Sequence, residues 1–211
     1  TPNESAPSDY SSTLEMLWNQ ADMFVLNVSS PNTPGLRELQ EVDHLSSILT
    51  ECKMMSDRKG GGKPLLLKLS PDNSDDEIIA SAQMAMRRGI DGFVATNTTL
   101  HRPVPRNAAS RSVFAESGGL SGRPLQARSN EVIRLLYEEA GPAVPIVGVG
   151  GIDSVDTAWQ AVASGASLLQ LYSALVFNGP SVVSGIVKGL RQRVKENGFL
   201  GIEEAVGLDI A

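Results

Sequence analysis

Five short apolar runs alternate with stretches of helical periodicity, and this alternation most constrains the fold of the chain. Strands separated by helices in this order form βαβ units, whose strands are parallel and buried on both faces. The predicted strands are residues 23–26, 64–69, 92–96, 144–149 and 167–171. We therefore expect an α/β fold built around a parallel sheet.

A polar residue or a glycine stands at the carboxyl end of every predicted strand, namely Asn27, Lys68, Asn97, Gly150 and Tyr172. This one-ended distribution is typical of a (β/α)8 TIM barrel, in which the βα loops build the site. A Rossmann-type open sheet also binds ligands at strand ends, but no Gly-x-Gly-x-x-Gly follows the first strand. The sequence supplies roughly five of the eight strands that such a barrel needs.

The remaining segments are predicted from caps and periodicity. Residues 1–9 are expected to be a flexible linker, and a helix is expected from Tyr10 to Asn19. Cys52 shares the apolar face of a helix over 38–57, so a role in the core is expected. Ser74 to Glu77 form a capping box that opens a helix. The long segment 100–128 has no clear periodicity and is expected to be a lid or binding loop.

Composition excludes several classes of protein. The chain has 211 residues with a formal charge of −6, whereas a nucleic-acid surface needs clustered Lys and Arg. One cysteine forbids an internal disulfide and a Cys-rich metal site, and two distant histidines make no metal centre. No run of about 18 apolar residues is present to span a membrane. The size suits one domain rather than two.

The loop after the first strand, residues 27–36, carries the most chemistry. Two prolines and a glycine end the strand in a shaped loop. Two carboxamides and three hydroxyls in it are neutral and can donate or accept hydrogen bonds. Such groups suit a flat polar ligand such as a pyrimidine ring. A polar turn with an N-cap explains Ser-Pro-Asn-Thr-Pro equally well when that string is taken alone.

Two further features indicate a phosphate-bearing ligand. Gly150 and Gly151 precede one predicted helix, and Tyr172 and Ser173 precede the next. These are the positions at which barrels of this type bind phosphate. Lys68 follows three leucines at a strand end, which favours a charge that faces the site over a merely solvated lysine.

Several strings together resemble one known family. They are Asn27–Leu36, Lys68–Asp72, Asp91–Thr99, Gly118–Leu125, Val147–Ile152 and Gly165–Ser173. In order and content they resemble the membrane-associated, quinone-reducing class (class 2) of dihydroorotate dehydrogenases. Ser30 selects that class, because the soluble classes carry cysteine at this position. The resemblance implies a (β/α)8 barrel that binds FMN, oxidises dihydroorotate to orotate in pyrimidine (UMP) biosynthesis, and passes electrons to a quinone.

The resemblance also implies residue roles. Asn27, Asn32, Asn97 and Thr98 would bind the pyrimidine ring. The residues expected at FMN are Asn27, Lys68, Thr96, Ser121, Gly122, Gly150, Gly151, Tyr172 and Ser173. Ser30 would take the C5 proton of the substrate. Because a serine hydroxyl is a poor base near neutral pH, we expect Thr33, three residues along the same loop, and a bound water to carry the proton onward.

Family chains begin well upstream, so residues 1–211 are expected to be the C-terminal part of a single FMN-binding barrel domain. Membrane contact would come from an N-terminal segment outside this sequence, at the inner mitochondrial membrane of a eukaryote or the cytoplasmic membrane of a bacterium. Two alternatives stay open. The first alternative is a flavin-free phosphate-binding isomerase or aldolase. The second is an inactive structural half-barrel.

Overall fold

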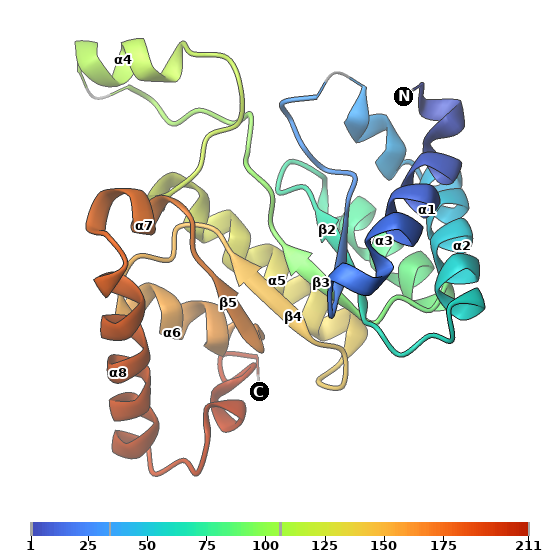
Figure 1. Ribbon diagram of the computed structural model, residues 1–211. Coiled ribbons are helices and arrows are strands. Elements are labelled where there is room, and N and C mark those ends of the chain that lie inside the picture. The colour runs from blue at the N-terminus through green and yellow to red at the C-terminus, as the bar shows by residue number, and fades with distance from the viewer. Residues whose placement is uncertain (1, 34, 106, 211) are drawn as a thin grey trace.

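The computed structural model describes residues 2–33, 35–105 and 107–210. Thr1 of the expected linker, Pro34 of the loop 27–36 and Arg106 of the segment 100–128 therefore lie outside the described residues. Five parallel strands form one sheet in the order β1-β2-β3-β4-β5, and helices flank it (Figure 1). The strands are β1 (Phe24–Asn27), β2 (Leu65–Leu69), β3 (Gly92–Ala95), β4 (Ile146–Val149) and β5 (Leu168–Gln170). All five coincide with predicted strands, which confirms the parallel α/β fold.

The two faces of the sheet have different surroundings. Leu65, Leu67 and Leu69 alternate along β2 and join the main core that the helices build. Leu66 belongs to a separate small cluster with Val94 and Val147 on the opposite face. Because strand side chains alternate between faces, this division places the core between sheet and helices.

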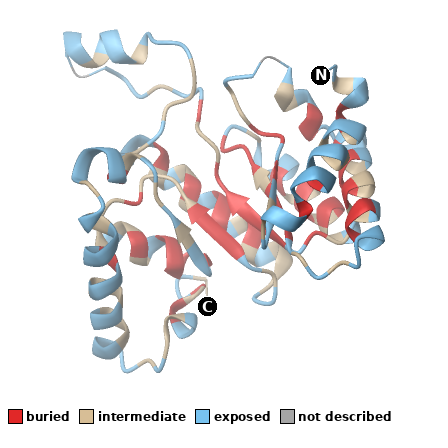
Figure 2. Ribbon diagram, viewed as in Figure 1, coloured by how far each residue is buried: buried red, intermediate tan, exposed pale blue. Residues whose placement is uncertain are grey.

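The opposite face is least covered at the edges of the sheet. Val25 in β1 is 40% exposed and Leu168 in β5 is 55% exposed. Among the described residues each edge strand pairs with one neighbour only. The buried interior and exposed rim can be followed in Figure 2.

The helices follow the predicted order with shifted ends. They are α1 (Ala6–Leu17), α2 (Val42–Arg58), α3 (Asp75–Arg87), α4 (Ala108–Phe114), α5 (Gln126–Ala140), α6 (Val155–Ala163), α7 (Ser173–Asn178) and α8 (Ser181–Glu196). The capping box at Ser74 is confirmed, with its hydroxyl accepting from the Glu77 N–H at 3.3 Å. Cys52 is fully buried in the core, as predicted, and desolvation raises its pKa to about 12.

Three boundaries differ from expectation. Residues 6–9, assigned to a linker, are the first turn of α1, where Pro7 suits an early helical position. The segment 100–128 contains the short helix α4, capped by Asn107; none of its residues is buried, so no apolar periodicity announces it. The one helix predicted after Tyr172 and Ser173 is two helices, α7 and α8, separated at Gly179, which has φ +69°, and Pro180.

No helix in the described part of the chain is both long and apolar enough to cross a membrane.

The capping box yields a stability prediction. We expect Ser74→Ala to lower the free energy of unfolding by about 1 kcal/mol, since the first turn of α3 loses its acceptor. Ser47→Ala is the matched control, because that exposed hydroxyl bonds only to the Asp43 carbonyl within α2. Urea unfolding of both variants checks this; equal effects would contradict the cap.

Candidate functional site

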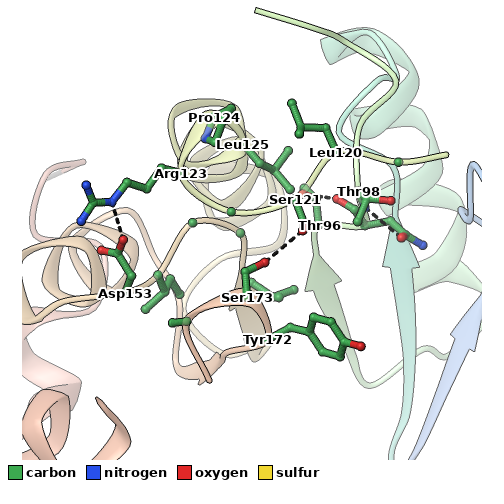
Figure 3. A pocket seen from close by; sticks show the side chains of 18 of the residues that line it. Thr96, Thr98, Leu120, Ser121, Arg123, Pro124, Leu125, Asp153, Tyr172 and Ser173 are labelled. Atoms are coloured by element: carbon green, nitrogen blue, oxygen red, sulfur yellow. Dashed lines mark hydrogen bonds and ion pairs between the residues drawn. The ribbon is translucent and has the colours of Figure 1, made fainter. Parts of the chain in front are cut away.

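A cavity of about 940 Å³ opens at the carboxyl ends of β2 to β5. It contains every predicted cofactor residue except Asn27, together with Asn97 and Thr98. Figure 3 shows side chains from the β3, β4 and β5 loops around it. The segment between β3 and α5 contributes Arg102, Val113 and Leu120 to the lining. This segment therefore borders the cavity, as expected for a binding loop.

At one end of the cavity, hydroxyls and glycines come together. The Ser121 and Ser173 hydroxyls lie 2.9 Å apart and join the β3 and β5 loops (Figure 3). An added Cβ at Gly150 would lie 2.0 Å from Ser129 Oγ. One at Gly151, which has φ +69°, would lie 2.6 Å from Gln126 Cβ. Packing against α5 thus requires both glycines, whatever ligand this end binds.

At the other end, carboxamides from two strands meet. Asn97 Nδ2 donates to Asn27 Oδ1 at 3.0 Å and to Ser29 Oγ at 3.1 Å. The Thr98 N–H donates to Asn97 Oδ1 at 2.8 Å. The structure therefore brings Asn27, Asn97 and Thr98 together, as predicted, and joins the ends of β1 and β3.

Asn32 and Ser30 lie in one turn of the β1 loop. The Asn32 N–H donates to Ser30 Oγ at 3.3 Å, and Asn32 Oδ1 accepts from the Gly119 N–H at 2.9 Å. An added Cβ at Gly119 would lie 1.9 Å from Thr98 Oγ1. Only glycine allows the long β3 loop to approach Thr98 and Pro31 this closely.

Thr33 lies elsewhere. It borders a second cavity of about 390 Å³ beside α1, which Asn27 and Tyr10 also line. The Tyr10 hydroxyl donates to the Asn27 carbonyl at 2.8 Å, and burial raises the pKa of Tyr10. The described residues make no hydrogen bond between Ser30 and Thr33, so their relay stays a prediction.

Two polar groups at the first cavity lack protein partners within the described ranges. Thr98 Oγ1 is buried without a hydrogen bond. The half-buried Lys68 ammonium makes no hydrogen bond or ion pair with a described residue, and desolvation lowers its pKa. Buried polar groups normally find partners, so both are suited to a bound ligand. Tyr172, by contrast, is 77% exposed at the cavity rim.

Sequence reasoning missed several residues around the site. Ser29 is fully buried beneath Asn97, and Ser129 lies 2.9 Å from the Thr96 hydroxyl. Arg102 donates to the backbone carbonyls of Thr99, Phe114, Glu116 and Gly118. The segment 100–128 has five arginines, so the sequence did not single out Arg102 among them. Ser129, inside a helix, gave no signal.

The parallel sheet with its helices is part of a (β/α)8 barrel, and the cavity lies at the carboxyl ends of its strands. The family model described as dihydroorotate dehydrogenase matches residues 3–194. The chain belongs to the dihydroorotate dehydrogenase family.

Known relatives extend this result. Two proteins named dihydroorotate dehydrogenase (quinone) match at 45% identity in Prochlorococcus marinus and 42% in Streptomyces coelicolor, over 98% and 99% of this chain. The chain covers 53% and 57% of their lengths. The crystal structure of DHODH from Eimeria tenella in complex with ferulenol superposes with a TM-score of 0.89 at 32% identity, covering 96% of this chain and 58% of that one. The chain thus spans little more than half of these relatives.

The close approach at Gly119 can be tested directly. We expect Gly119→Ala to push the β3 loop off Thr98, so that amides of residues 99–120 exchange hydrogen roughly tenfold faster or more. Gly185→Ala is the control, since an added Cβ in that α8 position meets nothing within 4 Å. Hydrogen exchange by mass spectrometry measures both; unchanged protection in Gly119→Ala would refute the contact.

Proposed function

We propose that this chain forms the FMN- and substrate-binding part of a quinone-reducing dihydroorotate dehydrogenase, which makes orotate for pyrimidine (UMP) biosynthesis. The observation that carries the proposal is that one site at the strand ends has two chemically different ends. Neutral carboxamides gather at one end and hydroxyls and glycines at the other. Lys68, which pairs with none of the described residues, lines the cavity. Family membership and the names of the relatives support the same reaction.

The residues present fit FMN. Lys68 offers a cation that no described residue pairs with, and a cation near the flavin ring stabilises its anionic reduced form. Ser121, Ser173, Gly122, Gly150, Gly151 and Tyr172 would hold the phosphate end, while Thr96 and Asn27 would lie nearer the ring. When bound, FMN accepts a hydride from C6 of dihydroorotate and is reoxidised by a quinone.

The ring of dihydroorotate would be bound by Asn27, Asn32, Asn97 and Thr98. Amide groups match the donors and acceptors of a pyrimidine ring without bringing a competing charge. Thr98 Oγ1, buried without a partner among the described residues, is a polar group that this ring would satisfy. The substrate therefore completes hydrogen bonding that the protein leaves open at this end.

Ser30 would hold the proton at its Oγ as that proton leaves C5 of the substrate. A serine hydroxyl is a weak base near neutral pH, so it must release its own proton as it accepts one. Thr33 and a water would carry that proton away from the site. A closed loop over the site would keep this water ordered.

The quinone and the membrane complete the proposal. Contact with a membrane would come through a segment that precedes these residues in the whole protein. The named relatives in Prochlorococcus and Streptomyces are bacterial. The cytoplasmic membrane of a bacterium is therefore the first location to test, and the inner mitochondrial membrane the second.

Ser30→Ala tests the proposed base in the complete enzyme. Flavin reduction by dihydroorotate, followed by rapid mixing, should slow roughly 10²–10⁴-fold, while orotate binding stays nearly intact because the amides remain. Ser30→Cys should retain activity with its pH optimum moved lower, because a thiol is more acidic. Ser12→Ala, an exposed serine in α1, is the control. A near-normal rate in Ser30→Ala would remove Ser30 from this role.

Lys68→Met tests the cofactor site with effects of opposite sign. The apoprotein should unfold at equal or higher temperature, because a desolvated ammonium without a described protein partner is removed. FMN affinity should fall roughly ten- to a hundredfold, since a charged hydrogen-bond partner is lost. The exposed Lys188→Met is the control. A protein that shows no flavin absorption even before mutation would favour the flavin-free isomerase or aldolase.

A further inference from the structure

Asp72 of the β2 loop lies outside the cavity lining but contacts the loops of the two neighbouring strands, β1 and β3. It follows β2, and its carboxylate pairs with Arg37 Nη2 of the β1 loop at 2.8 Å. From the β3 loop it accepts the Leu100 N–H at 2.8 Å and the Thr99 hydroxyl. Burial alone would raise the pKa of Asp72, but these donors lower it overall, so the carboxylate stays charged.

Thr99 connects Asp72 to the long β3 loop through hydrogen bonds of its own backbone. Its N–H donates to the Leu120 carbonyl at 3.0 Å, and its carbonyl accepts from the Leu120 N–H at 2.7 Å. The same carbonyl accepts from Arg102 Nη1 at 3.0 Å. Arg102 then binds three further carbonyls of the loop, so the segment from Thr99 to Leu120 is closed on itself.

The far end of that closed segment returns to the β1 loop. Gly119, next to Leu120, donates to Asn32 Oδ1 at 2.9 Å. Five positions after Asn32 in the sequence stands Arg37, which pairs with Asp72. The contacts therefore form a ring that runs from Asp72 through Thr99, Leu120 and Gly119 to Asn32, and back through Arg37.

We propose that Asp72 is a positioning residue for the substrate end of the site. Asp72 holds Asn32 and Thr98 in place without touching the pyrimidine ring of the substrate. The proposal rests on the proposed function, because it assigns the pyrimidine ring to these two residues. Thr98 precedes Thr99, and Asn32 is held by the loop that Thr99 anchors. The hydroxyls and glycines of the phosphate end take no part in this ring of contacts.

A second ion pair separates this role from general stability. Arg128 Nη1 contacts Asp75 at 2.8 Å, the same distance as Arg37 to Asp72, and Asp75 follows Asp72 by three residues. Neither partner of that pair lines the cavity. Asp75→Asn therefore makes the same chemical change at the same distance, between the first turn of α3 and α5. It leaves in place the bonds by which Arg128 holds the β2 loop at the Pro71 and Asn73 carbonyls.

The test uses the complete FMN-loaded enzyme and the variants Asp72→Asn and Asp75→Asn. Orotate binding, followed by the flavin absorption change, should weaken roughly ten- to a hundredfold in Asp72→Asn, because an amide group then faces donors. FMN content should stay at the wild-type level, and Asp75→Asn should bind orotate like wild type. Hydrogen exchange at Leu100 and Gly119 should rise only in Asp72→Asn.

A second pair of variants distinguishes the positioning role from misfolding. Thr99→Val removes the hydroxyl that donates to Asp72 while keeping the side-chain shape, and should reproduce the loss of orotate affinity. Thr99→Ser keeps the hydroxyl and should retain near-normal affinity. Equal behaviour of the two, or parallel loss of FMN and orotate in Asp72→Asn, would overturn the positioning role.

The proposed function fails in a different way. A wild-type enzyme that binds FMN but not orotate would overturn the substrate assignment, and this proposal with it. Normal orotate binding in Asp72→Asn would overturn only the role of Asp72.

Discussion

The alternation of side chains along β2 is the constraint on which the site depends. Leu65, Leu67 and Leu69 are buried against the helices, so Leu66 and Lys68 must face the other side of the sheet. A slip by one residue would place the Lys68 ammonium in the helical core and three leucines on the cavity side. Burial of the neighbouring leucines thus supplies the free energy that keeps Lys68 facing the site. No residue of the cavity has to bind Lys68 for this.

The two ends of the cavity are held in place by different means. At the end with the hydroxyls and glycines, Gly150 and Gly151 pack directly on α5, so the backbone position is fixed by contact with a helix whose apolar face is buried in the core. At the carboxamide end, the loops are held by hydrogen bonds to one another. Asn97 is bonded to Asn27, and Asn32 to Gly119. Hydrogen-bonded loops open more readily than packed elements. Opening is therefore easier at the carboxamide end than at the end with the glycines, which suits the proposed binding of substrate at the first and of cofactor at the second.

Much of this arrangement was predictable, because it follows from local pattern. Five apolar runs gave five strands in order, and the spacing of Ser74 and Glu77 gave a cap. Cys52 was placed in the core by helical periodicity alone. The polar residues at strand ends were placed correctly because parallel strands all bring their carboxyl ends to the same edge.

The remainder depends on contacts between residues far apart in sequence. Asn32 and Gly119, or Asp72 and Thr99, meet only when the fold is complete, and no spacing rule connects them. Helix α4 is too short and exposed to show apolar periodicity, and the break at Gly179 was hidden by helical patterns on both sides. Thr33 was proposed for the relay because it follows Ser30 by three residues in the same loop. It lines the second cavity, and its part in the relay stays a prediction. Sequence pattern therefore predicts which strand end carries a residue better than it predicts which loop that residue will contact.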